Sequence, residues 1–479
     1  MISIPPPGNE PVVGVIDTQF STNVYFRDWV EYHRLVDPAI TLTEKDYQHG
    51  TEVTSIIVDG PAGNPGREDG CGRFRVRHFG VGYASPMSSF ALMKMVRDIV
   101  RTNTDIRVWN ISLGSREEIR DFFISPEGAL LDALQAEFNV IFIVAGTNKP
   151  ATGSDLPMKI GAPADSINAI TVNATDLAGN PASYTRTGPV LHYFTKPDVA
   201  CFGGDGLRPE TKVQICSGQG ARFVSGTSYA APWITRKIAY MIHVLGFSRE
   251  TAKALLIDSA EGWVPENSRN TAELGHGVVP AHIGSIISCE PSEIRFVIQG
   301  KVLNYRTFRH DLPVPRDKFN RFNWNMRATL CYFPPCLREQ GVDYTLTELG
   351  LRFGRIMENG EIEQPSSLGN AGEKISEKTA RRSDGKWNNT KVIKKIISKG
   401  LKNYRDLYGF GVISNNRLKP LRENALPFSI VVTLRNRDGQ NRIADFMQMY
   451  QANGWFVEQV DHVSLENMSR IASEELEFS

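Results

Sequence analysis

The chain has 479 residues, of which 41% are hydrophobic and 22% are charged. This length exceeds that of one ordinary domain, so two domains are expected, each burying its own apolar core. Lysine and arginine number 54 against 53 aspartates and glutamates, for a net charge of +1. That balance excludes a bulk electrostatic attraction to nucleic acid or to an anionic membrane, and we expect neither as a partner.

The N-terminus and the cysteines indicate the cellular location. Met1–Glu10 reads MISIPPPGNE and has neither the basic segment nor the apolar run of a secretory signal. No apolar run approaches the length of a membrane span. The six cysteines are scattered without CxxC spacing, which favours reduced thiols. These features predict a soluble protein of the cytoplasm.

The first part of the chain alternates short β-branched runs with helical stretches. Strands are expected at Val12–Ile16, Arg107–Ile111, Val140–Val144 and Ala169–Val172, and helices at His49–Val58, Ser89–Thr102, Glu127–Phe138 and Thr227–Leu245. A further helix is expected after Ser248, a typical N-cap residue. This alternation predicts an α/β domain over residues 1–288, in which helices cover both faces of a parallel sheet.

After Ser288 the pattern changes to alternating strands separated by Pro, Gly and Asn. The expected strands are EIRFVI, RATLCYF, TELGLRF and FSIVVTLRN, so an all-β, sandwich-like domain is predicted for residues 289–479. A basic insertion near residues 373–405 is interpreted as a solvated loop followed by a short helix, or as a docking patch for an acidic partner.

Two segments of the first domain place residues of catalytic type at the ends of expected elements. VVGVIDT is an apolar run that ends in Asp17, at the edge where open α/β sheets carry their sites. HGTEVTSII opens a helix with His49, whose charge changes near neutral pH as a general base requires. Each residue alone also has an ordinary interpretation, Asp17 as a loop or capping residue and His49 as a polar surface residue.

A third segment, SGTSYAAPW, places Ser228 in the first turn of a long expected helix. Backbone N–H groups in a first helical turn have no intrahelical acceptor. Such a serine is therefore presented to solvent beside donors that can stabilise a developing oxyanion.

The chain order Asp17, His49, Ser228 is that of the subtilisin triad. The flanking residues VIDT, HGT and GTSYAAP resemble the three motifs of the subtilisin-like serine peptidases, and KPDVACFGG and LGHGVVPA resemble two further family segments. The resemblance covers roughly Pro11–Ile287. It implies the subtilisin-like fold, a sheet between two helical layers, and serine endopeptidase activity through an acyl-enzyme.

The resemblance also implies further site residues. NISLGS resembles the family segment that pairs with the substrate backbone, which makes Ser112, Leu113 and Gly114 substrate-binding candidates. The family's oxyanion asparagine follows Ala-Gly, whereas this sequence reads VAGTNKP. Asn148 is the first candidate for that donor because a side-chain amide donates well to an alkoxide, and Thr147 is the reserve.

No metal or other cofactor is required by this chemistry. Structural calcium is common in the family, but no acidic cluster with EF-hand spacing assigns it to residues of this sequence.

Alternatives to an independently active peptidase remain open. The departure at Thr147–Asn148 is compatible with a catalytically weak or inactive subtilase-fold protein that binds or regulates a partner. The β-rich region also resembles that of intracellular bacterial subtilases encoded beside AAA-type ATPases in defence loci. This likeness implies a polypeptide substrate and a regulatory protein partner, such as an AAA-type ATPase, acting through the C-terminal domain.

Overall fold

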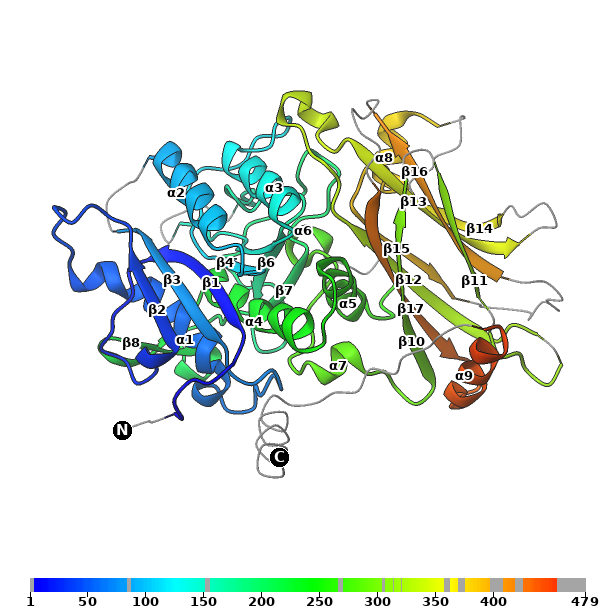
Figure 1. Ribbon diagram of the computed structural model, residues 1–479, viewed down its shortest axis with the longest axis horizontal. Coiled ribbons are helices and arrows are strands. Elements are labelled where there is room, and N and C mark those ends of the chain that lie inside the picture. The colour runs from blue at the N-terminus through cyan, green and yellow to red at the C-terminus, as the bar shows by residue number, and fades with distance from the viewer. Residues whose placement is uncertain are drawn as a thin grey trace.

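The computed structural model describes residues 4–83, 88–150, 156–265, 270–303, 306–312, 314–319, 321–356, 362–368, 375–396, 408–417 and 425–454. Within these ranges an α/β part and a β-rich part lie side by side (Figure 1). None of the helices in these ranges is both long and apolar enough to cross a membrane.

A seven-stranded sheet forms the centre of the α/β part. Its strands are β1 (Val12–Thr18), β2 (Val30–Arg34), β3 (Arg75–Gly82), β4 (Val108–Ile111), β5 (Ile141–Ala145), β6 (Ile170–Thr175) and β7 (Val199–Phe202). They lie in the order β2-β3-β1-β4-β5-β6-β7, and each adjacent pair is parallel. The carboxyl ends of all seven strands therefore meet at one edge, where open α/β sheets place their sites.

Helices cover both faces of this sheet (Figure 1). The helices of this part are α1 (Gln48–Gly63), α2 (Ser89–Thr102), α3 (Pro126–Phe138), α4 (Thr227–Ala239), α5 (Arg249–Glu261), α6 (Thr271–Leu274) and α7 (Gly284–Ile287), of which α1 to α4 contact the strands of the sheet and α5 and α7 pack on each other. Short 3-10 segments occupy Arg27–Trp29, Glu44–Tyr47 and Pro209–Thr211, and a π-helical turn, Tyr240–Val244, continues α4. A small hairpin of β8 (Val213–Ser217) and β9 (Gly220–Val224) packs by α1.

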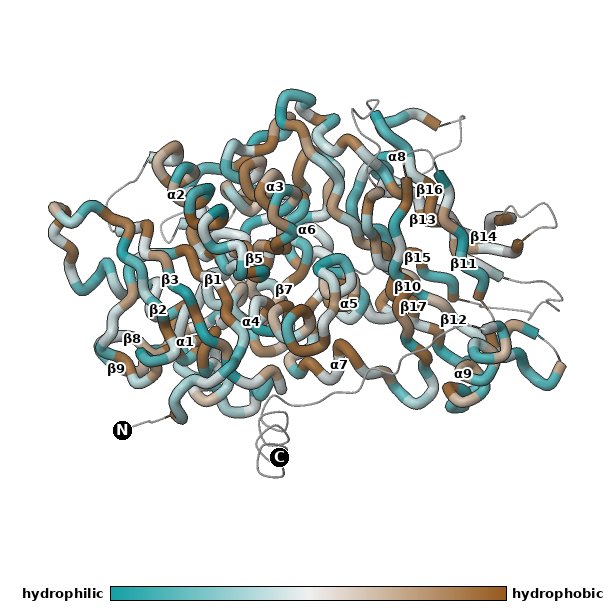
Figure 2. Tube along the Cα trace, viewed as in Figure 1, coloured by the Kyte–Doolittle hydropathy of each residue, from teal (hydrophilic) through white to brown (hydrophobic). Residues whose placement is uncertain are grey.

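Strand β5 shows why the central strands are apolar along their whole length. Ile141 and Ile143 belong to the core shared with α1 and α4, whereas Phe142 and Val144 belong to the core shared with α2 and α3. Successive side chains of a strand point to opposite faces, so a sheet covered on both sides needs apolar residues at every position. In Figure 2 the hydrophobic colour accordingly concentrates in the interior.

The β-rich part consists of two four-stranded antiparallel sheets. One has the order β10-β17-β12-β15 and the other β11-β16-β13-β14. The strands are β10 (Glu293–Val302), β11 (Thr307–Leu312), β12 (Trp324–Tyr332), β13 (Thr347–Ile356), β14 (Ile362–Leu368), β15 (Thr390–Lys395), β16 (Tyr408–Asn416) and β17 (Leu426–Asn436); the helices are a 3-10 segment (Arg338–Asp343), α8 (Glu377–Ser383) and α9 (Ile443–Ala452). Inward-facing side chains of both sheets, such as Leu330 and Phe410, form one apolar core, as in a sandwich.

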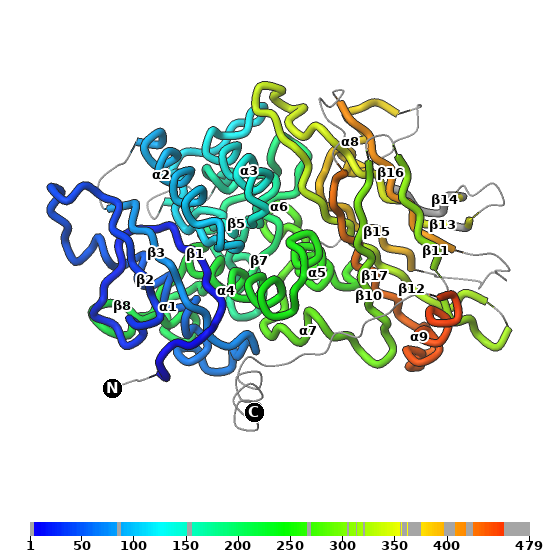
Figure 3. Tube along the Cα trace, viewed as in Figure 1, coloured from blue at the N-terminus to red at the C-terminus, as the bar shows by residue number. Residues whose placement is uncertain are grey.

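Helix α5 joins the two parts, since it packs against β12 and β17 of the sandwich (Figure 3). The buried Asp258 of α5 accepts two hydrogen bonds of 2.7 Å from Arg327 and bonds of 2.9 Å from Thr329 and Thr433. A buried carboxylate is strongly destabilising without its positively charged partner. The Asp258–Arg327 pair therefore favours one position of α5 against the sandwich.

The structure confirms the predicted fold class, a three-layer α/β part followed by a β-sandwich-like part. The division at residues 288 and 289 stays a prediction. One interpretation is wrong: residues 390–395 of the basic insertion form strand β15 against β12 rather than part of a solvated loop followed by a short helix. The buried Lys391 pairs at 2.6 Å with the equally buried Glu348 of β13, a strand of the other sheet, and this pairing neutralises its charge inside the sandwich. Residues 397–405 of the insertion lie outside the described residues.

Candidate active site

The carboxyl end of β1 and the first turn of α1 bring Asp17 and His49 together. His49 Nδ1 lies 2.6 Å from Asp17 Oδ1, and the same oxygen accepts a 2.7 Å hydrogen bond from the Thr18 N–H. Asp17 is fully buried, whereas about a third of the His49 side chain is exposed (32%). Because a carboxylate accepts hydrogen bonds, Nδ1 carries the proton and Nε2 is left as the basic nitrogen of the neutral ring.

The close contact of α1 with the end of β1 depends on Gly50. Its N–H donates to Thr18 Oγ1 at 2.8 Å. A Cβ atom at this position would lie 2.6 Å from the Thr18 carbonyl oxygen and 2.7 Å from that of Gln19. Only glycine lets the helix start approach the strand this closely, and this approach sets the position of His49.

His78, on β3, contacts the carboxyl end of β1 beside Asp17. Its role was not predicted from the sequence. Burial lowers the pKa of His78 to about 4, so the ring is neutral. Its Nε2 lies 2.8 Å from the Thr18 carbonyl oxygen, an acceptor only, so Nε2 holds the proton and Nδ1 accepts from Thr54 at 2.9 Å. No sequence motif surrounds His78, and only the parallel pairing of β3 with β1 reveals its role.

Two opposing effects act on the pKa of His49. Burial lowers this pKa, but the Asp17 carboxylate, together with Glu52, more than offsets burial, so the pKa of His49 lies above its ordinary value. The imidazole can thus accept a proton readily and be stabilised as an imidazolium.

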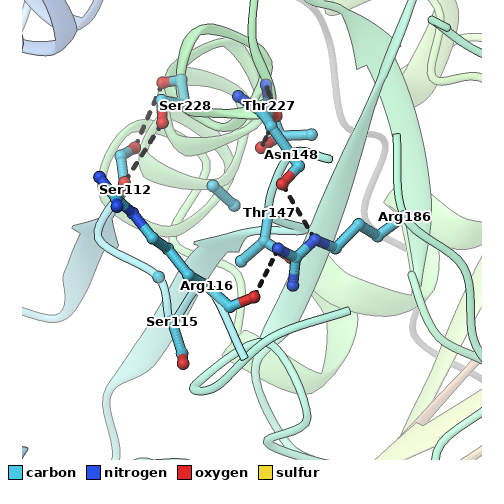
Figure 4. A pocket seen from close by; sticks show the side chains of 10 residues that line it. Ser112, Ser115, Arg116, Thr147, Asn148, Arg186, Thr227 and Ser228 are labelled. Atoms are coloured by element: carbon cyan, nitrogen blue, oxygen red, sulfur yellow. Dashed lines mark hydrogen bonds between the residues drawn. The ribbon is translucent and has the colours of Figure 1, made fainter. Parts of the chain in front are cut away.

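Ser228 lies in the first turn of α4, next to the end of β4. Its Oγ donates to the Ser112 carbonyl oxygen at 3.2 Å, and Ser112 Oγ donates to the Ser228 carbonyl oxygen at 3.2 Å (Figure 4). The hydroxyl of Ser228 therefore points to Ser112 rather than to His49. Rotation about the Cα–Cβ bond is the motion that redirects it, and catalytic hydrogen bonds of ligand-free enzymes are often incomplete in this way.

A buried contact ties the serine helix to the histidine helix. Tyr229, which follows Ser228, donates to Glu52 of α1 at 2.6 Å, and Arg222 donates to the other oxygen of Glu52 at 3.0 Å. The rings of Tyr229 and His49 lie 6.0 Å apart. The sequence contains both residues beside the motifs, in HGTE and TSY, but nothing in it indicates that they meet.

Asn148, just beyond β5, is held by hydrogen bonds to the start of α4. Its Oδ1 accepts from the Thr227 N–H at 3.1 Å and from Thr227 Oγ1 at 2.9 Å. These two bonds fix the amide so that Nδ2 is left as its donor, and Nδ2 would lie 3.2 Å from a Cβ on Gly226, two residues before Ser228.

Thr147 has a different environment from Asn148. Its hydroxyl donates to the Gly146 carbonyl oxygen and accepts from the Gly161 N–H at 2.9 Å. It is thus engaged by the main chain, and its backbone takes a positive φ of 70°.

A cavity of about 150 Å³ opens beside Ser228. Its lining residues come from the end of β5, from the loops after β4, β5 and β6, and from the start of α4: Ser112, Gly114, Ser115, Arg116, Ala145, Thr147, Asn148, Arg186, Thr227 and Ser228 (Figure 4). Of the predicted substrate-binding residues, Ser112 and Gly114 line this cavity and Leu113 does not. Across the described ranges no group of His, Cys, Asp and Glu side chains has the arrangement of a metal site.

The parallel sheet, with a histidine–aspartate pair and a serine at a helix start along one edge, is the architecture expected of a serine peptidase with an α/β fold. The model of the subtilase family matches residues 8–281, more than half of the chain. The chain belongs to the subtilase family and is a serine-type endopeptidase that acts on polypeptides.

Individual relatives are distant. The uncharacterized protein y4bN of Sinorhizobium fredii is 25% identical over 329 residues, which cover 55% of this chain and 75% of y4bN. The prenylagaramide maturation protease PagA matches 58% of this chain and 92% of its own, with 20% identity and a TM-score of 0.44. The match to the epidermin leader peptide processing serine protease EpiP of Staphylococcus aureus covers 59% of this chain and 76% of the EpiP chain, with 16% identity and a TM-score of 0.45.

Proposed function

We propose that the chain hydrolyses internal peptide bonds through an acyl-enzyme formed on Ser228. His49 removes the proton from Ser228 Oγ as this oxygen attacks the scissile carbonyl carbon, and then delivers it to the leaving amine. Water, activated by the same imidazole, releases the acyl group and restores the serine. Asp17 holds the imidazole in the tautomer with its proton on Nδ1 and stabilises the imidazolium.

The observation that carries this proposal is the 2.6 Å hydrogen bond between His49 and Asp17 at the sheet edge where the turn with Ser228 also lies. A neutral imidazole with a free Nε2 beside a serine is the arrangement that general-base activation requires.

Two donors are proposed to hold the oxyanion, the Ser228 N–H and Asn148 Nδ2. The Ser228 N–H belongs to a first helical turn and has no intrahelical acceptor. Asn148 is favoured over Thr147 because the hydroxyl of Thr147 already donates to Gly146. Loss of one such donor costs about 10²–10³ in kcat, so Asn148→Ala should lower kcat by that factor and Thr147→Val by much less.

The extended segment Ser112–Gly114 is proposed to align the substrate backbone. Peptides bound through main-chain hydrogen bonds are recognised in an extended form, largely independently of their side chains. The chemistry needs no cofactor; structural calcium is proposed for no particular residue.

Hydrolysis of an unfolded protein substrate tests the proposal. The purified full chain should cleave it, and Ser228→Ala, which removes one oxygen from a half-buried side chain, should keep the fold but lose nearly all cleavage. If both proteins are folded and equally inactive, the alternative of a non-catalytic binding protein replaces this proposal. The bond from Ser228 to Ser112 is the feature in favour of that alternative.

A cytoplasmic location and a regulatory protein partner on the β-rich part are also part of the proposal. The buried Asp258–Arg327 pair supports the second idea, because it couples the sandwich to a helix of the peptidase part. Activity that rises when a candidate AAA-type ATPase is added, and that no longer rises in Arg327→Lys, would support regulation by this route. An ATPase effect of equal size in both proteins would refute it.

A further inference from the structure

We propose that the peptidase cleaves after acidic residues, because the cavity beside Ser228 is built to receive the carboxylate of an Asp or Glu side chain that precedes the scissile bond. This inference rests on the proposed function, since it assigns the substrate class of the same site. Its basis is the lining of the cavity, to which Arg116 and Arg186 contribute together with Ser228; the Arg186 guanidinium lies against Asn148 and the main chain of Arg116 (Figure 4).

Arg186 is a buried cation, only 1% exposed, whose hydrogen-bond partners are neutral. It donates to the carbonyl oxygens of Asn148 at 2.9 Å, Arg116 at 2.8 Å and Glu117 at 3.5 Å. Among the described residues no carboxylate lies within ion-pair distance of it. Guanidinium has five N–H donors, so two remain for a ligand.

Burial explains why this site favours an anion. It lowers the pKa of Arg186, although the more distant Glu118 and Glu117 act in the opposite direction. A charge that has lost its water without gaining a counterion is unfavourable. A substrate carboxylate that enters the cavity supplies the missing counterion and makes charge-assisted hydrogen bonds, the stronger kind.

Positive charge continues from the cavity toward solvent. A second cavity of about 370 Å³ adjoins the first and is lined by Arg116, Asn148, Lys149, Pro150 and Arg186. Arg116 is exposed and forms no ion pair within the described part of the chain. The nearest acidic residues in sequence, Glu117 and Glu118, are exposed and line neither cavity.

The remaining walls are also polar and close together. Ser112, Ser115, Thr147 and Thr227, four residues with hydroxyl side chains, contribute to the lining. Thr147 Cγ2 would lie 2.4 Å from a Cβ atom on Gly114, so these two residues approach each other across the cavity. An aliphatic side chain in this space would cover Arg186 without neutralising its charge, which is unfavourable.

Peptide substrates that differ at a single position test the proposal. Internally quenched peptides are made identical except for Glu, Gln, Lys or Phe before the cleaved bond, and kcat/KM is measured with the full chain. Glu should exceed its neutral isostere Gln roughly 10- to 100-fold, the range of a hydrogen bond to a charged group, and Lys should be the poorest.

Variants assign the preference to the two arginines. Arg116→Gln, at an exposed position, should lower the Glu/Gln ratio severalfold, and Arg186→Gln should bring it close to one. Arg120→Gln is the matched control, because Arg120 is an exposed arginine of the same loop that lines neither cavity; its ratio should stay at the wild-type value. Circular dichroism establishes that the Arg186 variant is folded, and Arg116→Gln carries the test if it is not.

A Glu/Gln ratio near one in a wild-type protein that cleaves the peptides would overturn the inference and leave the proposed function intact. An unchanged ratio in Arg116→Gln and Arg186→Gln would overturn it as well. If none of the peptides and no unfolded protein is cleaved, and a fluorophosphonate does not label Ser228, the proposed function itself has failed.

Discussion

The hydrogen bond between His49 and Asp17 determines which imidazole nitrogen is available for catalysis. Because Asp17 Oδ1 occupies Nδ1, the base is Nε2, and the carboxylate keeps this assignment in both protonation states of the ring. The neutral His78 behind it orients the Thr18 carbonyl, so the support of the pair comes from the adjacent strand.

Asp17→Asn tests the role of the carboxylate. An amide can present its N–H to Nδ1 and select the opposite tautomer, so kcat/KM should fall by about 10⁴, as in known triads. Steady-state kinetics on one peptide gives the ratio. Asp28→Asn, a change at an exposed surface aspartate, should leave kcat/KM unchanged; a loss below tenfold in Asp17→Asn would contradict the assigned role.

The pH profile tests the raised pKa of His49. A general base acts when neutral, so kcat/KM should decline as pH falls through the pKa of the free enzyme. Because Asp17 and Glu52 together more than offset the effect of burial and raise this pKa, the midpoint of the acidic limb should lie above 6.5, the ordinary histidine value. In Asp17→Asn the residual activity should show a midpoint at lower pH; an unshifted midpoint would mean that another group titrates.

The three triad candidates could be predicted from the sequence because each lies in a short motif with its own local signal. Arg186, Glu52 and His78 could not. Their roles arise from pairings over long sequence separations, such as the bond from Glu52 to Tyr229, 177 residues away. Taken alone, each of these residues is an ordinary charged or polar side chain.

At the scale of elements, the site depends on how closely α1 and α4 approach the ends of β1, β4 and β5. Asp17 lies at the end of β1, Ser112 follows β4, and Asn148 follows β5, so three adjacent parallel strands supply the floor of the site. The starts of two helices on the same face then add His49 and Ser228, whose own N–H has no intrahelical acceptor in the first turn.

Gly50→Ala tests the contact of α1 with β1. The added methyl group would meet two carbonyl oxygens at 2.6 and 2.7 Å, so it should lower the free energy of unfolding by about 1–3 kcal/mol, the usual range for overpacking, and also reduce kcat/KM. Urea unfolding measures the first effect. Gly63→Ala, in the same helix, meets nothing closer than 3.6 Å and should be close to neutral; equal effects would refute the steric account.

Elements with a clear hydrophobic periodicity could be predicted from the sequence, and elements without one could not. Helix α2 was predicted with its observed bounds, and Ser248 caps α5 as expected, with its side chain accepting from the Thr251 N–H. Strand β3 was missed because RVRHFGVG mixes charged and apolar residues, and β15 was missed because its lysines indicated solvent. Glu348, which neutralises the charge of Lys391, lies on another strand, so the sequence around β15 does not reveal this pairing.

At the scale of the whole molecule, the sandwich and the peptidase part share a charged interface that excludes water. Asp258 is fully buried and lies within ion-pair distance of Arg327 and Arg295. Removing one partner of such a pair leaves an uncompensated buried charge.

Asp258→Ala should therefore destabilise the protein by about 3–5 kcal/mol, the range for breaking a buried pair. The decrease in unfolding midpoint by scanning calorimetry measures this effect, and increased protease sensitivity between the two parts would accompany it. Asp28→Ala, at an exposed ion pair with Arg27, should change the midpoint little. A stable Asp258→Ala protein would show that apolar packing alone holds the two parts together.

Fluorophosphonate labelling is the most direct test of the claim that Asp17, His49 and Ser228 form one catalytic unit. Peptide mass spectrometry of the labelled full chain should find the adduct on Ser228, with labelling at least 100-fold slower in His49→Ala and absent in Ser228→Ala. An unlabelled Ser228, or a labelling rate that does not depend on His49, would contradict the account.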